Sequence, residues 1–259
     1  MKFKFLNKAL LLEIGNRKNA RKILVIADLH IGHEEALNKA GIFIPRTQFK
    51  ETVSDLEEIF KKIGKVDEII VLGDLKHEFG EISQQEWRET QDILDFFKSK
   101  VKRGGKVVLI KGNHDTILEP IAKRKELKIR DFYIINYGFK NNKKDKKDKI
   151  CFLHGHKLFP ECLDEKIKFL VLGHRHPAII LHDKYKKEKY KCFLVGKYKR
   201  KEVVILPSFF GLIEGTDMIS LNDRCLFISE RDLINFQVKI VESGKIYNFG
   251  RLKDINRLT

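Results

Sequence analysis

The sequence predicts an α/β sandwich in which two packed β-sheets have helices on the outside. Two observations lead to this prediction. In the first two thirds of the chain, short apolar runs alternate with longer stretches of helical spacing, as in parallel sheets built through helical crossovers. After residue 177 the apolar runs are short and separated by turn residues, which predicts hairpins that form a second sheet.

Five apolar runs predict buried strands. They are KILVIAD (22–28), DEIIVLGD (67–74), KVVLIKGNHD (106–115), KICFLHGH (149–156) and IKFLVLGHRH (167–176). Between these runs, residues 46–63 and 84–101 carry apolar side chains three and four positions apart, which predicts two helices. The residues SQQE at 83–86 have the pattern of a capping box that would begin the second helix.

The part of the chain after residue 177 predicts strands without a long helix. Its apolar runs are AIILHD (178–183), KCFLVGKY (191–198), EVVILPS (202–208), CLFISE (225–230) and NFQVKIVES (235–243). No linker divides the sequence, so we expect a single domain over residues 1–259. Its polar motifs lie in 23–177, and its β-rich part is 178–259.

The composition is typical of a cytoplasmic globular protein. Hydrophobic residues make up 42% of the 259 residues, which is enough for a sizeable core. The uninterrupted apolar stretches are far shorter than a membrane span, and residues 1–22 are too polar for a signal peptide. The four cysteines contain no C-x-x-C pair, which argues against a zinc ribbon. We therefore expect a cytoplasmic protein that does not bind membranes.

Two segments contribute most of the net charge of +16. Residues 140–149 carry six lysines against two aspartates, and residues 183–202 carry nine basic against three acidic side chains. Basic segments attract phosphodiester backbones, and the aromatic residues between the lysines of the second segment suit nucleic acid. Solvated loops and an exposed hairpin in a lysine-rich chain would give the same pattern. Both interpretations stay open.

Each of the five predicted strands ends in a polar cluster. The clusters contain Asp28 and His30, Asp74 and His77, Asn113 and His114, His154 and His156, and His174 and His176. Seven of the nine histidines lie in these clusters, a distribution that unrelated structural roles would not produce. The carboxyl ends of parallel strands lie along one edge of a sheet, where open α/β folds bind ligands. We therefore expect the clusters to converge.

The residue types in these clusters indicate a metal centre. Imidazole, carboxylate and amide ligands suit Mn, Fe, Zn, Ni or Co rather than Ca or Mg alone. The number of candidate ligands exceeds what one zinc ion needs. Two ions bridged by one carboxylate would use all of them, and such a pair is suited to in-line displacement at phosphorus.

The order Asp-x-His, Gly-Asp, Gly-Asn-His-Asp, His, Gly-His-x-His over residues 23–177 resembles the calcineurin-like metallophosphoesterase superfamily. This resemblance implies a four-layer α/β/β/α sandwich of two mixed sheets flanked by helices. The segments ADLHIGHE (27–34) and GDLKHE (73–78) look closest to the SbcD-type DNA repair nucleases. The segment LPSFFGLIEGTDM (206–218) resembles the archaeal SbcD-related phosphoesterases.

The resemblance also implies a ligand set and a mechanism. One divalent ion would be held by Asp28, His30, Asp74 and His176, and a second by Asp74, Asn113, His154 and His174. Mn²⁺ is expected in both places, with Fe, Zn, Ni or Co as alternatives. A water shared between the ions and acidified to hydroxide would attack phosphorus. His114 would meet the phosphate or the leaving-group oxygen as an electrostatic stabiliser or an acid.

One position bears on the substrate. Protein phosphatases of the superfamily end the second motif with Asp-Arg-Gly, where this chain has His77 and Glu78. A histidine here resembles the nucleases, in which it assists in handling the phosphodiester. The resemblance therefore implies hydrolysis of phosphate esters, with phosphodiesters and DNA as the favoured substrates. The alternatives are nucleotides or other small phosphate esters and, less favoured because every ligand position is filled, a catalytically inert interaction scaffold.

Three further residues lie among the candidate ligands. Arg175 and His156 are candidates for contact with the substrate, against the simpler roles of a solvated cation and a residue that packs a turn. Asp115 is expected to cap the helix that follows it. SbcD-type nucleases have an additional C-terminal region for DNA and for an ATPase partner, and this chain ends soon after the second sheet. We therefore do not expect an ATPase partner of that type, while a homodimer stays open.

Overall fold

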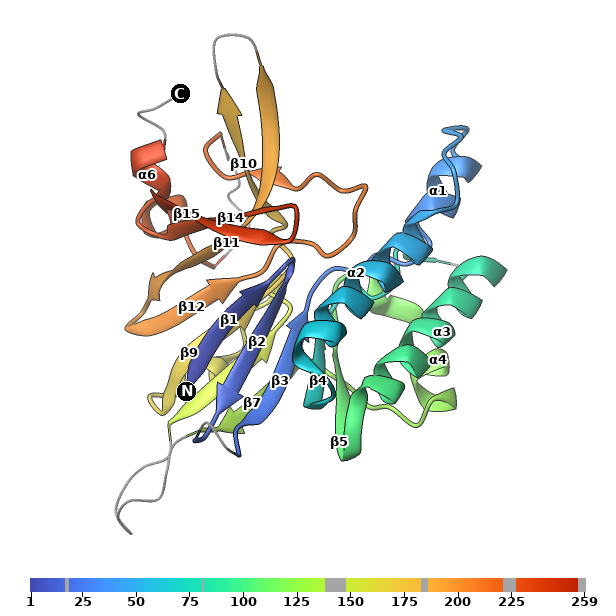
Figure 1. Ribbon diagram of the computed structural model, residues 1–259, viewed down its shortest axis with the longest axis horizontal. Coiled ribbons are helices and arrows are strands. Elements are labelled where there is room, and N and C mark those ends of the chain that lie inside the picture. The colour runs from blue at the N-terminus through green and yellow to red at the C-terminus, as the bar shows by residue number, and fades with distance from the viewer. Residues whose placement is uncertain (17–18, 81, 138–147, 183–185, 221–226, 256–259) are drawn as a thin grey trace.

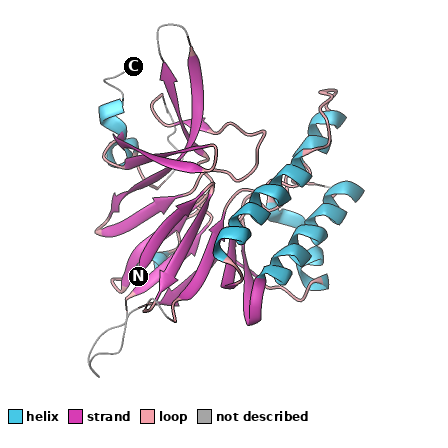
Figure 2. Cartoon of the chain, viewed as in Figure 1, coloured by secondary structure: helices cyan, strands magenta, loops and turns pink. Residues whose placement is uncertain are grey.

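The computed structural model describes residues 1–16, 19–80, 82–137, 148–182, 186–220 and 227–255. Within these residues, two β-sheets pack face to face, and the longer helices cover the outer face of the first sheet (Figure 1 and Figure 2). Short helices lie against the outer face of the second sheet. The predicted fold class, two mixed sheets flanked by helices, is confirmed.

The first sheet combines a parallel part with an antiparallel edge. Its strand order is β1 (Lys2–Leu6), β2 (Ala9–Ile14), β3 (Arg21–Ile26), β4 (Val66–Leu72), β5 (Val101–Ile110) and β6 (Ile129–Arg130). The strands from β3 to β6 pair in parallel, whereas β1 and β2 form a hairpin whose second strand pairs antiparallel with β3. This hairpin was not predicted. Its two-residue turn begins at Asn7, whose φ of 51° suits a tight hairpin turn.

Helices connect the parallel strands of the first sheet. They are α1 (His33–Lys39), α2 (Gln48–Ile63), α3 (Gln84–Lys100) and α4 (Glu119–Arg124), with the 3₁₀ turn η1 (Asp115–Ile117) before α4. The helices predicted over 46–63 and 84–101 are therefore confirmed as α2 and α3. The apolar faces of both helices pack on the same side of the sheet, which leaves its other side for the second sheet.

The second sheet takes in strands from both parts of the chain. Its strands are β7 (Phe132–Asn136), β8 (Lys149–Leu153), β9 (Ile167–Leu172), β10 (Pro177–His182), β11 (Lys187–Tyr198), β12 (Lys201–Ile205), β13 (Thr216–Asp217), β14 (Gln237–Glu242) and β15 (Lys245–Arg251). In its middle, β8, β9 and β12 run parallel. The second sheet was expected to form after residue 177, but it also takes in β7, β8 and β9, so two of the five motif strands lie beside the C-terminal strands.

One predicted C-terminal strand is replaced by a helix. Part of CLFISE (225–230) lies outside the described residues, and the described part forms no strand. Instead, Ser229 accepts a hydrogen bond from the backbone N–H of Asp232 and begins α5 (Glu230–Leu233). Together with η2 (Pro160–Leu163) and α6 (Leu252–Ile255), this helix makes up the outer cover of the second sheet.

The core has three apolar layers because side chains alternate along each strand. In β3, Leu24 and Ile26 point toward the helices, while Ile23 and Val25 point toward the second sheet. The middle layer lies between the sheets and includes Phe152 from β8. Full burial of each such side chain stabilises the fold by about 1.5–3 kcal/mol. The ends of the central strands are therefore held in fixed positions.

The N-cap of α3 gives a prediction for stability. The side chain of Ser83 accepts a hydrogen bond from the backbone N–H of Glu86 (3.0 Å), as the capping pattern predicted. Replacing Ser83 with alanine should lower the free energy of unfolding by about 0.5–2 kcal/mol, measured as a lower urea midpoint with an unchanged slope. Ser99→Ala, near the other end of the same helix, serves as the control. Equal midpoints for both variants would contradict a capping role.

Candidate metal centre

The polar clusters meet where the edges of the two sheets come together. The backbone N–H of Asp28, after β3, donates to the carbonyl oxygen of Gly73, after β4 (3.2 Å). The N–H of His114, after β5, donates to the carboxylate of Asp74 (2.9 Å). From the second sheet, the N–H of His174 donates to both carboxylate oxygens of Asp28 (3.0 and 3.2 Å). The five clusters thus converge, although two sheets contribute them.

One group of potential ligands consists of Asp28, His30, Asp74 and His176, whose donor atoms all lie within 4.8 Å of one another. The Nε2 atoms of His30 and His176 are 3.3 Å apart. Nε2 of His176 lies 3.4 Å from Oδ1 of Asp28, and Nε2 of His30 lies 3.9 Å from Oδ2 of Asp74. These are the four side chains that the sequence assigned to the first ion.

A second group consists of Asp74, His154 and His174. Nε2 of His154 is 3.3 Å from Oδ2 of Asp74 and 3.1 Å from Nδ1 of His174. The amide oxygen of Asn113 lies 3.1 Å from the same Nε2 atom. The set assigned to the second ion is therefore also brought together, and Asp74 belongs to both groups.

The backbone of the site is strained. Five of the candidate ligands have a positive φ: Asp28 (55°), His30 (45°), Asp74 (48°), His174 (68°) and His176 (45°). Such a conformation costs about 1–3 kcal/mol for a residue other than glycine and is typical of functional sites. Two glycines allow the close packing, since a Cβ on Gly73 would lie 2.6 Å from Nδ1 of His154 and one on Gly112 would lie 2.1 Å from Oδ1 of Asp74.

Both carboxylates of the site are held in the ionised form. Burial alone would raise the pKa of Asp28, but the charge of His176 and its hydrogen bond outweigh burial and lower it. Burial opposes ionisation of Asp74 as well, yet the hydrogen bond and charge of His154 bring its pKa well below the usual range. Ionised carboxylates are the form that binds a metal ion.

The imidazoles differ in charge. Burial lowers the pKa of His30 to about 3 and is also the main reason that the pKa of His174 falls to about 4, so both rings are neutral at pH 7. For His154, burial also acts downward, but the hydrogen bond to Asp74 and the charges of Asp28 and Asp74 raise its pKa to about 9. The hydrogen bond from its Nδ1 to the carbonyl oxygen of Leu72 (2.6 Å) directs Nε2 toward the carboxylates.

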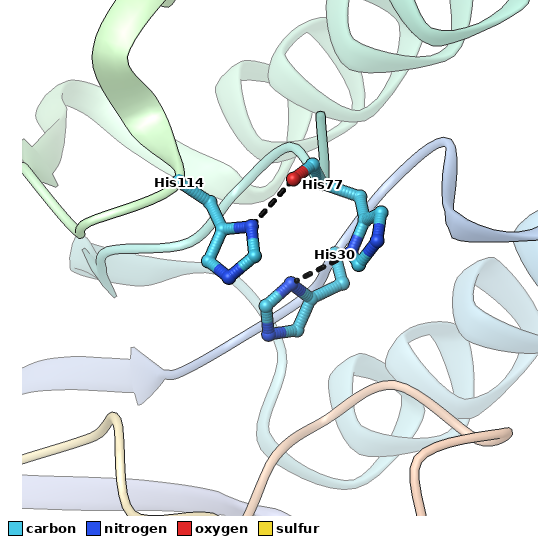
Figure 3. Close-up of side chains that lie close together, drawn as sticks. All are labelled: His30, His77 and His114. Carbon is cyan, nitrogen blue, oxygen red and sulfur yellow. Dashed lines mark hydrogen bonds between the residues drawn. The ribbon is translucent and has the colours of Figure 1, made fainter. Parts of the chain in front are cut away.

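His77 and His114 stand beside the first group (Figure 3). Nδ1 of His77 is 3.4 Å from Nδ1 of His30, and Nδ1 of His114 donates to the backbone carbonyl oxygen of His77. Burial and the neighbouring His33 and His114 lower the pKa of His77 to about 4. Because this hydrogen bond engages Nδ1 of His114, the Nε2 atom of the ring can contact another partner.

Two buried carboxylates that we did not assign to the site support its loops. Glu86 accepts hydrogen bonds from the N–H groups of His77 (2.8 Å) and Glu78 (3.0 Å). In a capping box its carboxylate would bond the backbone N–H of Ser83, but here it stabilises the loop after β4 instead. Asp115 was expected to cap the following helix, and this is wrong. Its carboxylate accepts from the N–H groups of Gly112 (2.9 Å) and Leu75 (3.1 Å), which ties the loop after β4 to the loop after β5.

Local sequence patterns could reveal only part of this support. The S-x-x-E pattern singled out Glu86, but its contact with residue 77 bridges nine positions. The contact of Asp115 with Leu75 bridges forty positions. Burial and the charge of Asp74 raise the pKa of Asp115 to about 6.

The two candidates for contact with the substrate, Arg175 and His156, differ in where they lie relative to the ligand groups. The guanidinium of Arg175 is buried and donates to the carbonyl oxygen of Ile228 (2.8 Å), away from the ligand groups. The half-buried ring of His156 has its centre 5.2 Å from that of His154 and 6.0 Å from that of His174. His156 is therefore near the second ligand group, and the contact of either residue with substrate stays a prediction.

The basic segments are described only in part. Of residues 140–149, only 148 and 149 are described, and 183–185 lie outside the described residues as well. The rest of 183–202 forms most of the hairpin of β11 and β12, and β11 also pairs with β10 in an arm that extends from the sandwich (Figure 1). In the described part of the chain, no helix is both long and apolar enough to cross a membrane.

A comparison with known families agrees with this geometry. The sequence model of the family described as "Calcineurin-like phosphoesterase" matches residues 21–213, which include all seven candidate ligands. The chain belongs to this family. As a calcineurin-like phosphoesterase, it is a metal-dependent hydrolase of phosphate esters. No curated protein matches the chain.

This calcineurin-like phosphoesterase is also similar to solved structures, and the first of the two below shares its fold. The nuclease MPE of Pseudomonas putida is 17% identical, with a TM-score of 0.55, and the match covers 92% of this chain and all of that one. Vps29 of Entamoeba histolytica, solved with zinc, is 16% identical, with a TM-score of 0.38, and covers 88% of this chain and 96% of its own.

The site fits the divalent ions that the calcineurin-like phosphoesterase family implies. Its donors are carboxylate, imidazole and amide groups, a set that suits first-row transition metals. Asp74 is ionised and belongs to both groups, so it can bridge two ions. In metal-binding imidazoles, the nitrogen that does not bind the metal commonly donates a hydrogen bond, and Nδ1 of His154 donates one to the carbonyl oxygen of Leu72.

Binding of metal should release a proton from His154. Because the pKa of this ring is about 9 in the metal-free protein and a ligand must be neutral, binding at pH 7.5 should release about one proton. Apparent affinity should then rise about tenfold per pH unit and level off above pH 9. Calorimetry in two buffers of different ionisation enthalpy measures the proton count. His156→Gln should leave it unchanged, since the pKa of that ring is about 4. A count of zero would show that His154 is neutral without metal.

Proposed function

We propose that this calcineurin-like phosphoesterase is a dinuclear phosphodiesterase related to the SbcD-type nucleases, with DNA among its substrates. The placement of His77 carries the proposal. It lies 3.4 Å from a candidate ligand, His30, and its carbonyl oxygen holds His114. His77 thus stands at the aspartate, and Glu78 at the arginine, of the Asp-Arg-Gly ending of the phosphoprotein phosphatases. A phosphodiester carries one negative charge and a monoester up to two, so the site without this permanent cation favours diesters.

In this proposal Asp28, His30, Asp74 and His176 hold one ion, and Asp74, Asn113, His154 and His174 hold the other. Mn²⁺ is the expected metal. The distances between these side chains and the shared position of Asp74 support the assignment. Bound ions would supply Lewis acidity toward the phosphate and activate a water for attack on phosphorus.

The side chains of the protein position the substrate and move the proton. In its imidazolium form, His114 gives the Nε2 proton to the oxygen that leaves phosphorus and becomes the neutral ring, whose Nδ1–H stays bonded to the carbonyl of His77. His77 contacts the phosphodiester beside it. Glu86 keeps this loop in place through the two N–H groups that it accepts. A fixed arrangement of this kind lowers the barrier without further ordering during the reaction.

The test compares substrates at a fixed Mn²⁺ concentration. We expect kcat/KM to be higher for bis(p-nitrophenyl) phosphate than for p-nitrophenyl phosphate, and we expect cleavage of end-labelled DNA. Asp74→Asn, run in parallel, should cleave none of them. Preference for the monoester would overturn the diesterase proposal. Hydrolysis of the diester without cleavage of DNA would instead favour small phosphodiesters, such as nucleotides, as the substrates.

The other predictions about partners stay part of this proposal. Binding of DNA through residues 140–149 and 183–202 should weaken steeply as salt rises, because each phosphate contact releases counterions. We measure this slope with an uncleavable phosphorothioate strand. A cytoplasmic location and activity without an SbcD-type ATPase partner are part of the same proposal, and a homodimer stays open.

A further inference from the structure

A row of aromatic rings runs past the ligand groups to an exposed end. In order, its rings belong to Phe210, His33, His77, His114 and Phe79, with centre-to-centre distances of 5.4, 4.0, 5.2 and 3.9 Å. The first ring is buried, at 2% exposure, whereas Phe79 at the other end is 54% exposed. The row therefore presents an apolar ring to solvent directly beside His114.

Phe79 is held in this position by its backbone. Its carbonyl oxygen accepts a hydrogen bond from the hydroxyl of Thr116 (2.7 Å), which belongs to the loop after β5. The preceding residue, Glu78, donates its N–H to the buried carboxylate of Glu86 (3.0 Å). Both neighbouring elements thus fix the loop that carries the ring. A ring fixed beforehand loses little conformational freedom when a ligand stacks on it.

We propose that Phe79 forms the wall of a subsite for an unpaired nucleobase on the leaving-group side of the scissile phosphate. The proposal rests on the function proposed above, in which His114 protonates the leaving oxygen. The ring of Phe79 touches the ring of His114, so the nucleoside that carries this oxygen has its base near Phe79. Stacking of a base on such a ring is worth about 1–3 kcal/mol.

The chemistry of phenylalanine defines the specificity of this subsite. Every nucleobase has a π-face, and the phenyl ring has no polar group to read base edges, so all four bases should be accepted. A base inside a duplex is already stacked on both faces. The subsite therefore favours single strands and frayed ends over intact duplexes.

A single exposed apolar ring is common on protein surfaces and need not bind anything. What distinguishes Phe79 is its place. It lies at the end of a row that includes His77 and His114, and its ring is 54% exposed beside that of His114. A ring placed at random would have no fixed relation to His114.

The experiment uses the full chain with Mn²⁺ and four dinucleotides. The first is TpT. In two others one nucleoside, either on the leaving side or on the opposite side, is replaced by an abasic tetrahydrofuran, and in the fourth both are replaced. Hydrolysis is followed by chromatography. Removing the base on the leaving side should lower kcat/KM about 5- to 150-fold, which corresponds to the stacking energy. Phe79→Ala should lower kcat/KM for TpT by a similar factor and leave the doubly abasic dinucleotide unchanged. Phe79→Tyr should retain activity on TpT.

Two controls separate this inference from the proposed function. Phe249→Ala changes another partly exposed phenylalanine, on β15, and should leave all four rates unchanged. Bis(p-nitrophenyl) phosphate reports whether phosphodiesters are hydrolysed at all. Equal rates on TpT and the doubly abasic dinucleotide would overturn the nucleobase subsite and leave the diesterase intact. Failure to hydrolyse any diester would overturn the proposed function and this inference with it.

Discussion

Asp74→Asn is expected to abolish hydrolysis of every phosphate ester that the wild-type protein cleaves. Asp74 belongs to both ligand groups, and the charges around it keep its carboxylate ionised. An amide in its place keeps the shape of the side chain but removes the charge that the two proposed cations would need. Since a metal contributes several kcal/mol to the stabilisation of the transition state, kcat/KM should fall by about 10³-fold or more.

The same variant should bind less metal, which separates loss of the centre from loss of folding. Metal content per chain, measured after dialysis against Mn²⁺, should fall while the thermal unfolding transition stays cooperative. Asp67→Asn provides the matched control, because Asp67 lies on the same strand at the end away from the site. Full activity and full metal content in Asp74→Asn would refute the bridging role.

The sequence predicted the residues of the site better than it predicted the strand topology that positions them. Each motif contains its own strand ending, glycine and polar residues, so the convergence of Asp28, Asp74 and His154 could be expected from local patterns alone. The division of the motif strands between two sheets could not. β8 and β9 are apolar runs like β3 and β4, and nothing within a run specifies which strand pairs with it. Pairing of β9 with β12 joins segments about thirty residues apart and depends on the whole core.

The hairpin of β1 and β2 was missed for a different reason. Its residues alternate between lysine and phenylalanine and then become a continuous apolar run, around a turn without glycine. Asn7 supplies the positive φ that glycine usually provides, and that signal was present in the sequence. The roles of Glu86 and Asp115 were beyond any local pattern, because their partners lie nine and forty positions away.

His114→Gln should have its largest effect on substrates with a poor leaving group. If His114 gives a proton to the departing oxygen, loss of the ring should lower kcat by about 10²–10⁴-fold on TpT, whose leaving alkoxide needs that proton. On bis(p-nitrophenyl) phosphate, whose leaving phenolate is stable without a proton, the loss should be less than about tenfold. KM should change little on either substrate, because the remaining side chains still bind the phosphate.

The comparison of leaving groups decides what His114 does. An equal loss on both substrates would show that the ring stabilises charge on the phosphate and transfers no proton. The geometry favours proton transfer, because Nδ1 is fixed by the carbonyl of His77 and Nε2 is the nitrogen that remains. His182→Gln, on the exposed end of β10, is the control for replacing a histidine and should keep full activity on both substrates. Because His77 provides that carbonyl through its backbone, His77→Gln should lower the rates on both substrates by similar factors and should not widen the difference between leaving groups as His114→Gln does.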